Sequence, residues 1–459
     1  MSQEHEPTPA PKQTIPISRR RFLAAAAGAL AAPMILPASV LGQNPPSSKL
    51  NIAFIGVGGR GAASLGGLSG QNFVAFCDVD TRRCEKEMKK HPQVKLYRDF
   101  RRMLDEKGKE IDAVAVSTPD HTHAVAAMAA IKRGKHVYCE KPLAHSIGEV
   151  RALMAAARRH KVVTQLGNQG HSAEHIRLMC EWIWDGAIGN VHTIHAVSKS
   201  MHCKIELLPQ LSERPPVPPE LDWDQWLGPA KARPYQPLYV PNTWRGWSVF
   251  GCGAIGDWVC HVVDPSFWAL DLGAPKTIQA QAKDYDPKRH GETFPAGSIV
   301  TYEFPAKGKR GPVKLVWFDG VEKPPRPADM DPEKEDKVPE TGAIIMGDKG
   351  TLVHGSHGAG GLHLIPWAKM NDYKQHLPEK KLPRVRNHHQ DWLDAIKEGR
   401  QAGSNFDYGG PLTEIALLGI IAIKFLGRKL EWDAQKMRFT NCREANQFIN
   451  PPYRAGWSL

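Results

Sequence analysis

KLNIAFIGVGGRG, residues 49–61, is an apolar run that passes directly into a glycine-rich turn. Gly56, Gly58 and Gly61 fit the pattern G-x-G-x-x-G, with a strand before it and a helix beginning near Arg60. Such glycines permit a tight turn, close approach of a pyrophosphate to the backbone, and close packing of helix on strand. The free N–H groups and positive dipole of a helix N-terminus favour phosphate. The stretch therefore predicts a dinucleotide-binding unit.

A second apolar run, residues 73–77, ends at Asp78, which stands 22 positions after the first glycine. A carboxylate at about this spacing binds the ribose hydroxyls and repels a 2′-phosphate, which favours NAD over NADP. Asp80 competes for this role, and Asp78 could instead cap the next helix. Arg82 and Arg83 could accommodate a 2′-phosphate, so NADP stays open.

Strands and helices alternate through the rest of this region. Apolar runs at 111–116, 136–139 and 162–167 predict strands, and residues 124–133 predict a helix. Such alternation is typical of a parallel, doubly wound sheet. We therefore expect a Rossmann domain over residues 49–167.

Polar groups follow two of these strands, where ligands bind in open parallel sheets. The loop 117–123 is expected against the cofactor ribose or nicotinamide, because its two histidines have no third ligand at metal-site spacing. Lys141 follows the strand 136–139 and can meet both a cofactor and a hydroxylated substrate; alternatively it pairs with Glu140 in solvent. The cofactor-binding candidates are Gly56, Gly58, Gly59, Arg60, Gly61, Asp78, Ser117, Thr118, Pro119, His121, Glu140 and Lys141.

The segment 253–264 predicts an apolar helix that carries Asp257 and His261 four positions apart, on one face. A carboxylate beside an imidazole fixes its tautomer and raises its basicity, which suits proton removal from an alcohol. An ordinary Asp–His pair on a helix is the alternative. Trp244 and Arg245 can stack on a sugar and bind its hydroxyls, or Trp244 can be buried in the core. The substrate-binding candidates are Lys141, Asn168, Trp244, Arg245, Asp257 and His261.

The N-terminus predicts an export signal. Ser18-Arg19-Arg20-Arg21-Phe22-Leu23 precedes an Ala-rich apolar run over 24–32, as in twin-arginine signals. We expect a signal peptide over 1–42, a linker over 43–48 and a periplasmic protein, with an uncleaved membrane anchor as the alternative.

The net charge and the spacing of the cysteines bear on which partners, disulfides and metal sites the protein could have. The net charge of +12 is spread along the chain without a basic tail, which argues against a nucleic-acid partner. The eight cysteines form no Cys-x-x-Cys pair, so we expect free thiols rather than disulfides or a metal site. His388, His389 and Asp391 are expected to face solvent, with the lining of the ligand cleft as the alternative.

The glycine pattern, the loop 117–123 and Glu140-Lys141-Pro142 together resemble the Gfo/Idh/MocA oxidoreductases. The resemblance implies an α+β substrate and oligomerisation domain over 168–459, built on a large, mostly antiparallel open sheet whose outer face pairs with another subunit. It implies that the helix 412–426 returns to pack on the Rossmann domain. It also implies catalytic roles for Lys141, Asp257 and His261, with the histidine as acid/base.

These inferences predict an exported NAD(P)-dependent oxidoreductase acting on a sugar, sugar derivative or cyclitol. Free NAD is scarce outside the cytoplasmic membrane, so we expect a tightly bound cofactor that is loaded before export by the twin-arginine machinery. A redox-neutral, NAD-dependent glycosidase or lyase of the same superfamily is the first alternative. A non-catalytic sugar-binding module is the second.

Overall fold

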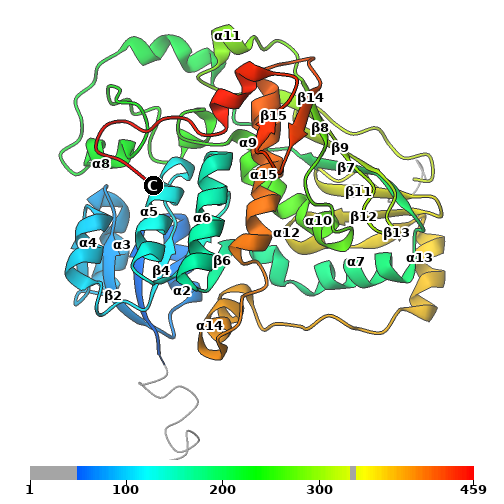
Figure 1. Ribbon diagram of the computed structural model, residues 1–459, viewed down its shortest axis with the longest axis horizontal. Helices are drawn as coiled ribbons and strands as arrows, with labels where there is room; N and C mark the ends of the chain where they lie inside the picture. Colours follow the sequence, from blue (N-terminus) through cyan, green and yellow to red (C-terminus); the bar gives the residue numbers. More distant parts are fainter. Residues whose placement is uncertain (1–48, 331–336) are drawn as a thin grey trace, which may run out of the picture. The chain divides into compact units, whose positions relative to one another are not determined.

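The computed structural model describes residues 49–330 and 337–459 (Figure 1). All of these except Lys49 belong to one compact unit, Leu50–Leu459. The predicted signal peptide and linker, residues 1–42 and 43–48, lie outside the described residues.

The first half of the fold is a six-stranded parallel sheet with strand order β3-β2-β1-β4-β5-β6. Its strands are β1 (Asn51–Ile55), β2 (Asn72–Cys77), β3 (Lys95–Tyr97), β4 (Ala113–Val116), β5 (His136–Glu140) and β6 (Thr164–Gly167). Its helices are α2 (Arg60–Gly67), α3 (Thr81–Lys90), α4 (Phe100–Lys107), α5 (Asp120–Lys132) and α6 (Ile147–His160). The strand order reverses between β1 and β4, and this is where a doubly wound sheet binds its ligand. The predicted Rossmann fold is confirmed.

Local sequence explains why these elements form. All four residues of β4 are buried and apolar, as expected for a strand covered on both faces. The helix α6 begins with a capping box in which the Ser146 hydroxyl and the Glu149 carboxylate each accept a backbone N–H. Asp80 and Asp99 cap α3 and α4 in the same way, through their side-chain oxygens.

The second half is a nine-stranded sheet with order β13-β12-β11-β7-β10-β9-β8-β14-β15. Only β7 and β10 pair in parallel; the other neighbours run antiparallel, so the predicted mostly antiparallel sheet is confirmed. Its strands are β7 (Val191–Ser198), β8 (Thr277–Gln281), β9 (Gly297–Phe304), β10 (Val313–Gly320), β11 (Thr341–Gly347), β12 (Thr351–Gly355), β13 (His363–Ile365), β14 (Leu430–Asp433) and β15 (Arg438–Phe439).

The α-helices of this half are α7 (Glu174–Asp185), α8 (Trp223–Leu227), α9 (Gly253–Val262), α10 (Asp264–Ala269), α11 (Pro287–His290), α12 (Ser356–Ala359), α13 (Trp367–Tyr373), α14 (His388–Glu398) and α15 (Phe406–Ile423). Short 3₁₀ turns are η3 (Gln169–Ser172), η4 (Ile205–Ser212), η5 (Thr243–Gly246), η6 (Lys374–His376) and η7 (Arg443–Phe448).

The helix α15 joins the two halves (Figure 1). It contacts α6 and β6 of the first sheet and also α9, β8 and β9. Glu414 pairs with Arg151 of α6, and the Thr413 hydroxyl accepts the Leu143 N–H at 3.2 Å. Among the described residues, α15 is long and apolar enough to cross a membrane by length and composition, but most of it is buried inside the protein, as in a core helix.

The expectation that the start of α14 faces solvent is wrong. His388 and Asp391 are each 3% exposed. The His388 ring contacts the Leu166 carbonyl at 2.7 Å and the Ser172 hydroxyl at 2.8 Å, while Asp391 accepts the Gly403 N–H at 2.7 Å. Polar residues at a helix start were expected in water, but here they tie α14 to the carboxyl end of β6.

Candidate active site

One cleft joins the glycine-rich turn to the helix α9. Its lining includes Gly56 and Gly58 at one end and Lys141, Asp257 and His261 at the other. The two sets of predicted residues, which are far apart in the sequence, therefore face one space.

The glycine turn leaves no room for side chains. Gly56 has φ +84°, and a Cβ there would lie 2.6 Å from the Ser117 carbonyl oxygen; at Gly61 it would lie 2.1 Å from the Gly56 oxygen. A Cβ at Gly58 would meet the Arg83 side chain at 2.8 Å. The following helix α2 has no side-chain cap, and of its first-turn amides the Gly61 N–H donates to the Gly58 oxygen at 3.0 Å, so the Arg60 and Ala62 amides remain available to phosphate.

Asp78 holds this turn in place. Its carboxylate accepts N–H groups from Val57 at 2.9 Å, Gly58 at 3.3 Å and Asp80 at 3.1 Å. Burial raises the pKa of Asp78 above its ordinary value, although the three N–H groups oppose the rise. Asp80, not Asp78, caps α3, so the capping alternative for Asp78 is wrong. Since Oδ1 receives a single N–H, it can still accept a ribose hydroxyl.

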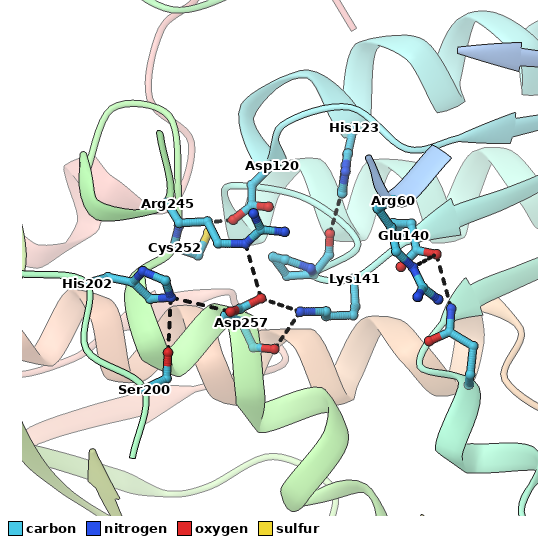
Figure 2. Close-up of polar contacts among 12 residues, drawn as sticks. Arg60, Asp120, His123, Glu140, Lys141, Ser200, His202, Arg245, Cys252 and Asp257 are labelled. Carbon is cyan, nitrogen blue, oxygen red and sulfur yellow. Dashed lines mark hydrogen bonds and ion pairs between the residues drawn. The ribbon is translucent and has the colours of Figure 1, made fainter. Parts of the chain in front are cut away.

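Glu140 binds the glycine-turn arginine rather than the neighbouring lysine. Arg60 Nε donates to Glu140 Oε1 at 2.9 Å (Figure 2), and the Gln169 amide donates to the same oxygen at 3.1 Å. The alternative of a solvent pair between Lys141 and Glu140 is therefore wrong. Arg60 and Glu140 both line the cleft between the glycine turn and Lys141.

Lys141 lies at the end of β5 and is fixed by α9. Its Nζ donates to the Asp257 backbone oxygen at 2.6 Å and to Asp257 Oδ1 at 2.5 Å (Figure 2). Arg245 Nε also donates to Oδ1 at 3.2 Å, and His202 Nε2 lies 3.3 Å from Oδ2. Burial alone would raise the pKa of Asp257, but the Lys141 charge, followed by His202 and Arg245, holds that pKa well below its usual value.

The predicted pairing of Asp257 with His261 is wrong. Neither ring nitrogen of His261 bonds to a described residue, and Nδ1 is buried without a partner. The shared helix face brings the two side chains near each other. The Asp257 carboxylate instead contacts Lys141, Arg245 and His202, which come from other segments of the chain. Charged hydrogen bonds outcompete a neutral imidazole.

His261 packs instead on a histidine that the motifs did not identify. The His261 and His357 rings stack with centroids 4.1 Å apart and planes 24° apart, and both residues line the cleft. Desolvation, reinforced by the charge of Lys141 and by His357, holds the pKa of His261 well below its ordinary value. The ring is thus a neutral proton acceptor at neutral pH.

Replacing His357 by phenylalanine tests this stack. The ring packing is kept, together with the desolvation and the Lys141 charge that chiefly lower the pKa of His261, while the smaller electrostatic contribution of His357 to that lowering is lost. We expect the acidic limb of the kcat/KM profile to move to higher pH and kcat to fall about tenfold. The matched control is His376→Phe on the exposed turn η6, which should leave the profile unchanged. An acidic limb that stays at the same pH in His357→Phe would contradict the electrostatic effect of His357 on the pKa of His261.

The loop after β4 divides into two parts. Ser117, Thr118 and Pro119 line the cleft as predicted, but His121 does not. His121 is 3% exposed, and its ring nitrogens face the Phe250 and Trp226 carbonyls at 3.3 and 3.0 Å. The cofactor role predicted for His121 is therefore wrong, because helix α5 already begins at Asp120 and turns this ring into the core.

Five of the six substrate-binding candidates line the cleft, and Asn168 does not. The Arg245 guanidinium lies 4.2 Å from the centre of the Trp244 ring, and both residues line the cleft. Asn168 is fully buried, donates to Asp264 Oδ2 at 3.0 Å and accepts the Ser404 hydroxyl at 2.7 Å. The substrate role predicted for Asn168 is wrong, since those bonds use its amide in the core.

Sequence reasoning missed other polar residues around the site. His202 comes from the loop after β7, and Gln169 from η3. His123 reaches across the loops, with ring nitrogens 2.7 Å from the Pro142 oxygen and 2.8 Å from the Thr118 oxygen. In residues 49–330 and 337–459, no group of three or more His, Cys, Asp and Glu side chains could hold a metal ion.

The residues present fit a dinucleotide. Gly56 and Gly58 pack too closely on Ser117 and Arg83 to carry a Cβ, which gives the tight turn that a pyrophosphate can approach, and the uncapped α2 N-terminus and the Asp78 carboxylate supply donors and an acceptor. A nicotinamide ring beyond them would lie beside Lys141, at the carboxyl end of β5.

Comparison with known families gives the same assignment. A sequence model of the Gfo/Idh/MocA oxidoreductases, described as an NAD-binding Rossmann fold, matches residues 50–168. A model of that family's C-terminal alpha/beta domain matches residues 204–304 and 347–459. The chain belongs to the Gfo/Idh/MocA oxidoreductase family. Its cofactor is accordingly NAD.

Curated Gfo/Idh/MocA relatives match part of the chain. Levoglucosan dehydrogenase of Pseudarthrobacter phenanthrenivorans is 27% identical over 218 residues, which cover 47% of this chain and 46% of that protein. Glycosyl hydrolase family 109 protein 2 of Akkermansia muciniphila is 29% identical over 177 residues, which cover 36% of each. The chain thus spans less than half the length of the relatives named here.

Solved structures share the fold over most of the chain. The aldose-aldose oxidoreductase from Caulobacter crescentus, complexed with glycerol, has a TM-score of 0.54 at 17% identity. The match covers 84% of this chain and 100% of that one.

Proposed function

We propose that this protein is an exported NAD-dependent oxidoreductase that acts on a CH–OH group of a sugar, sugar derivative or cyclitol, with a tightly held cofactor. The observation that carries the proposal is the meeting of Lys141, Asp257 and His261 at the far end of a dinucleotide cleft. The dehydrogenase names of its relatives support the same substrate class.

The side chains of the cleft have distinct roles in this reaction. NAD, when bound, supplies the hydride acceptor or donor. Lys141 has three N–H donors and gives two to Asp257, so the third can bind the oxygen of the reacting hydroxyl. His261 is neutral and unpartnered, so it can take the hydroxyl proton during oxidation and return it during reduction. Asp257 orients the ammonium group of Lys141 rather than the imidazole of His261.

Export gives the reason for a retained cofactor. The segment Ser18–Leu23 carries the twin-arginine pattern, which supports folding and cofactor loading before passage into the periplasm. A cofactor that dissociated in every turnover would be lost there. We therefore expect the nicotinamide to be oxidised and reduced in place, by paired substrates or within one redox-neutral cycle.

The test is to purify the full chain without added cofactor, denature it and assay the supernatant for NAD. We expect close to one NAD per chain. An empty protein that binds NAD weakly, or release of fresh NADH in every turnover, would contradict the retained cofactor. Fractionation of the host cell, with Arg19→Lys/Arg20→Lys as the control, tests the periplasmic location: the variant should remain inside.

A redox-neutral glycosidase is the second candidate. The His261–His357 stack favours it, because transient oxidation followed by elimination needs one group to take a proton and another to protonate the leaving group. A relative named as a glycosyl hydrolase supports the same idea. Release of the aglycone from a glycoside by the NAD-loaded protein, without accumulation of NADH, would favour this candidate over a net oxidoreductase.

Assembly forms the last part of the proposal. We expect a homo-oligomer that pairs through the outer face of the nine-stranded sheet, as the family resemblance implies. Light scattering of the full chain measures its mass in solution, and a monomer would contradict the proposed assembly.

A further inference from the structure

A segment of the second half of the chain lies on the nucleotide-binding half. Residues 220–222 run alongside residues 79–81, directly after β2. The Asp222 N–H donates to the Val79 oxygen at 2.8 Å, the Thr81 N–H donates to the Glu220 oxygen at 3.2 Å, and Asp80 and Leu221 form an antiparallel bridge. The segment is therefore attached to the strand end that positions Asp78.

The same segment forms part of the cleft wall. Gln225 and Trp226 of α8 line the cleft together with Asp78 and Arg98. Arg98 also donates to the Glu220 oxygen at 3.1 Å. Because Asp78 marks the position of the adenosine ribose, these residues border the adenosine half of the site rather than the reacting half.

Arg454, near the C-terminus, holds the end of α8. Its Nε donates to the Gly228 oxygen at 2.6 Å, Nη1 to Asp224 Oδ1 at 2.7 Å and Nη2 to the Asp224 backbone oxygen at 2.7 Å. Its N–H donates to the Pro229 oxygen at 3.1 Å. Two of these bonds satisfy the Gly228 and Pro229 carbonyls just beyond the end of α8, and the Asp224 backbone oxygen also accepts the Gly228 N–H at 3.3 Å. The Arg454 side chain is only 16% exposed.

The residues around Arg454 are fixed to the nucleotide-binding half. The Tyr453 hydroxyl donates to Glu149 at 2.6 Å. The Trp457 ring centre lies 4.5 Å from the Arg101 guanidinium, and Lys132 Nζ donates to the Leu459 oxygen at 2.9 Å. The C-terminal segment thus ties α8 to the helices α4, α5 and α6.

We propose that residues 219–230, the adenosine clasp, close over the adenosine half of the NAD site, and that Arg454 latches the clasp shut. This inference rests on the proposed function, since it concerns retention of that cofactor. NAD leaves only when α8 moves away from residues 79–81. Arg454 opposes that movement, because its four hydrogen bonds connect the end of α8 to the C-terminal segment, which is itself held by α4, α5 and α6. The latch lies outside the reacting end and takes no part in catalysis.

The experiment compares the rate of NAD release from the purified full chain and from Arg454→Leu. Each protein is loaded with NAD and diluted into an excess of an NAD-consuming enzyme, and the NAD that remains bound is followed with time. We expect release to accelerate at least about tenfold, because several charge-assisted bonds of the closed state are lost. The control is Arg428→Leu, at an arginine that bonds to Asn441 and Glu444, away from the clasp.

A second variant keeps the test decisive if Arg454→Leu folds poorly. Asp224→Ala removes the oxygen that accepts Arg454 Nη1, and because the Asp224 side chain is 68% exposed the variant should fold, so release should again accelerate. Melting of the apoproteins is measured in parallel. A lower melting temperature with an unchanged release rate in either variant would overturn the latch. If the wild type itself holds no NAD, the proposed retention fails; if the wild type retains NAD and both variants retain it equally well, only the clasp fails.

Discussion

Replacing Lys141 by methionine is expected to lower kcat/KM by about a thousandfold while NAD binding is retained. Methionine keeps most of the length and apolar volume of the side chain but removes the donors that bind Asp257 and the reacting hydroxyl. The variant also leaves the Asp257 carboxylate without the cation that contacts it at 2.5 Å. Steady-state kinetics with a sugar substrate, together with titration of NAD, measure the two effects separately.

The control is Lys135→Met, which changes the lysine immediately before β5, at the opposite end of the same strand. It should behave as the wild type. Adding Asp257→Asn to Lys141→Met should cost little further activity, because residues that act as a unit are not additive. A double variant whose losses multiply would contradict the view that Asp257 acts through Lys141.

Replacing His261 by glutamine is expected to lower kcat by about a thousandfold, again without loss of NAD. The pH dependence carries the sharper test. Because the pKa of His261 lies well below its ordinary value, the neutral base persists as the pH falls through that value. Oxidation by the wild type should therefore stay nearly constant from pH 8 down past about 6.5, the value of a free imidazole.

The lowered pKa of His261 also makes the stability of the protein depend on pH, and this limits the pH range in which rates can be measured. A histidine with a depressed folded-state pKa takes up a proton more readily in the unfolded chain, so its contribution to stability is lost as the pH falls below the unfolded value. Rates should be measured only where circular dichroism shows folded protein. The pH–rate profile of the wild type could instead show an acidic limb near the ordinary pKa of imidazole, or an acidic limb that persists unchanged in His261→Gln. Either result would rule out His261 as the base.

The dinucleotide half of the fold was predictable because its signals are local. The run 49–55 and the glycines after it require a strand, a turn and a helix in that order, and the buried strands that follow have no polar face. The role expected for Asp78 rests on spacing alone. Its bonds to the glycine-turn N–H groups did not, since side-chain contacts across the turn leave no mark on the sequence.

Most of the residues predicted for the site line the cleft, but His121 and Asn168 do not, and the predicted pairing of Asp257 with His261 is wrong. A spacing of four places Asp257 and His261 on one helix face, but it does not say what else reaches the carboxylate. Lys141 and Arg245 arrive from distant segments and bind it more strongly than the neutral imidazole of His261. The i,i+4 pairing was therefore overridden by tertiary contacts that involve charge.

The partners of His261 and Asp257 were missed for the same reason. His357 lies in a glycine-rich turn with φ +55°, and His202 lies in a loop without regular structure. The fold brings His357 to the cleft and His202 to the Asp257 carboxylate, and no local sequence pattern indicates either approach. A histidine flanked by glycines, as in Gly355-Ser356-His357-Gly358, was the one available signal.

The most direct measurement is a single turnover of the NAD-loaded protein with a panel of sugars and cyclitols, followed by the absorbance of reduced nicotinamide. We predict that at least one member reduces the bound cofactor in the wild type, and that the same member fails with Lys141→Met and His261→Gln, although both variants remain loaded. Equal rates in all three proteins, or a loaded wild type that no member reduces, would contradict a CH–OH oxidoreductase centred on Lys141 and His261.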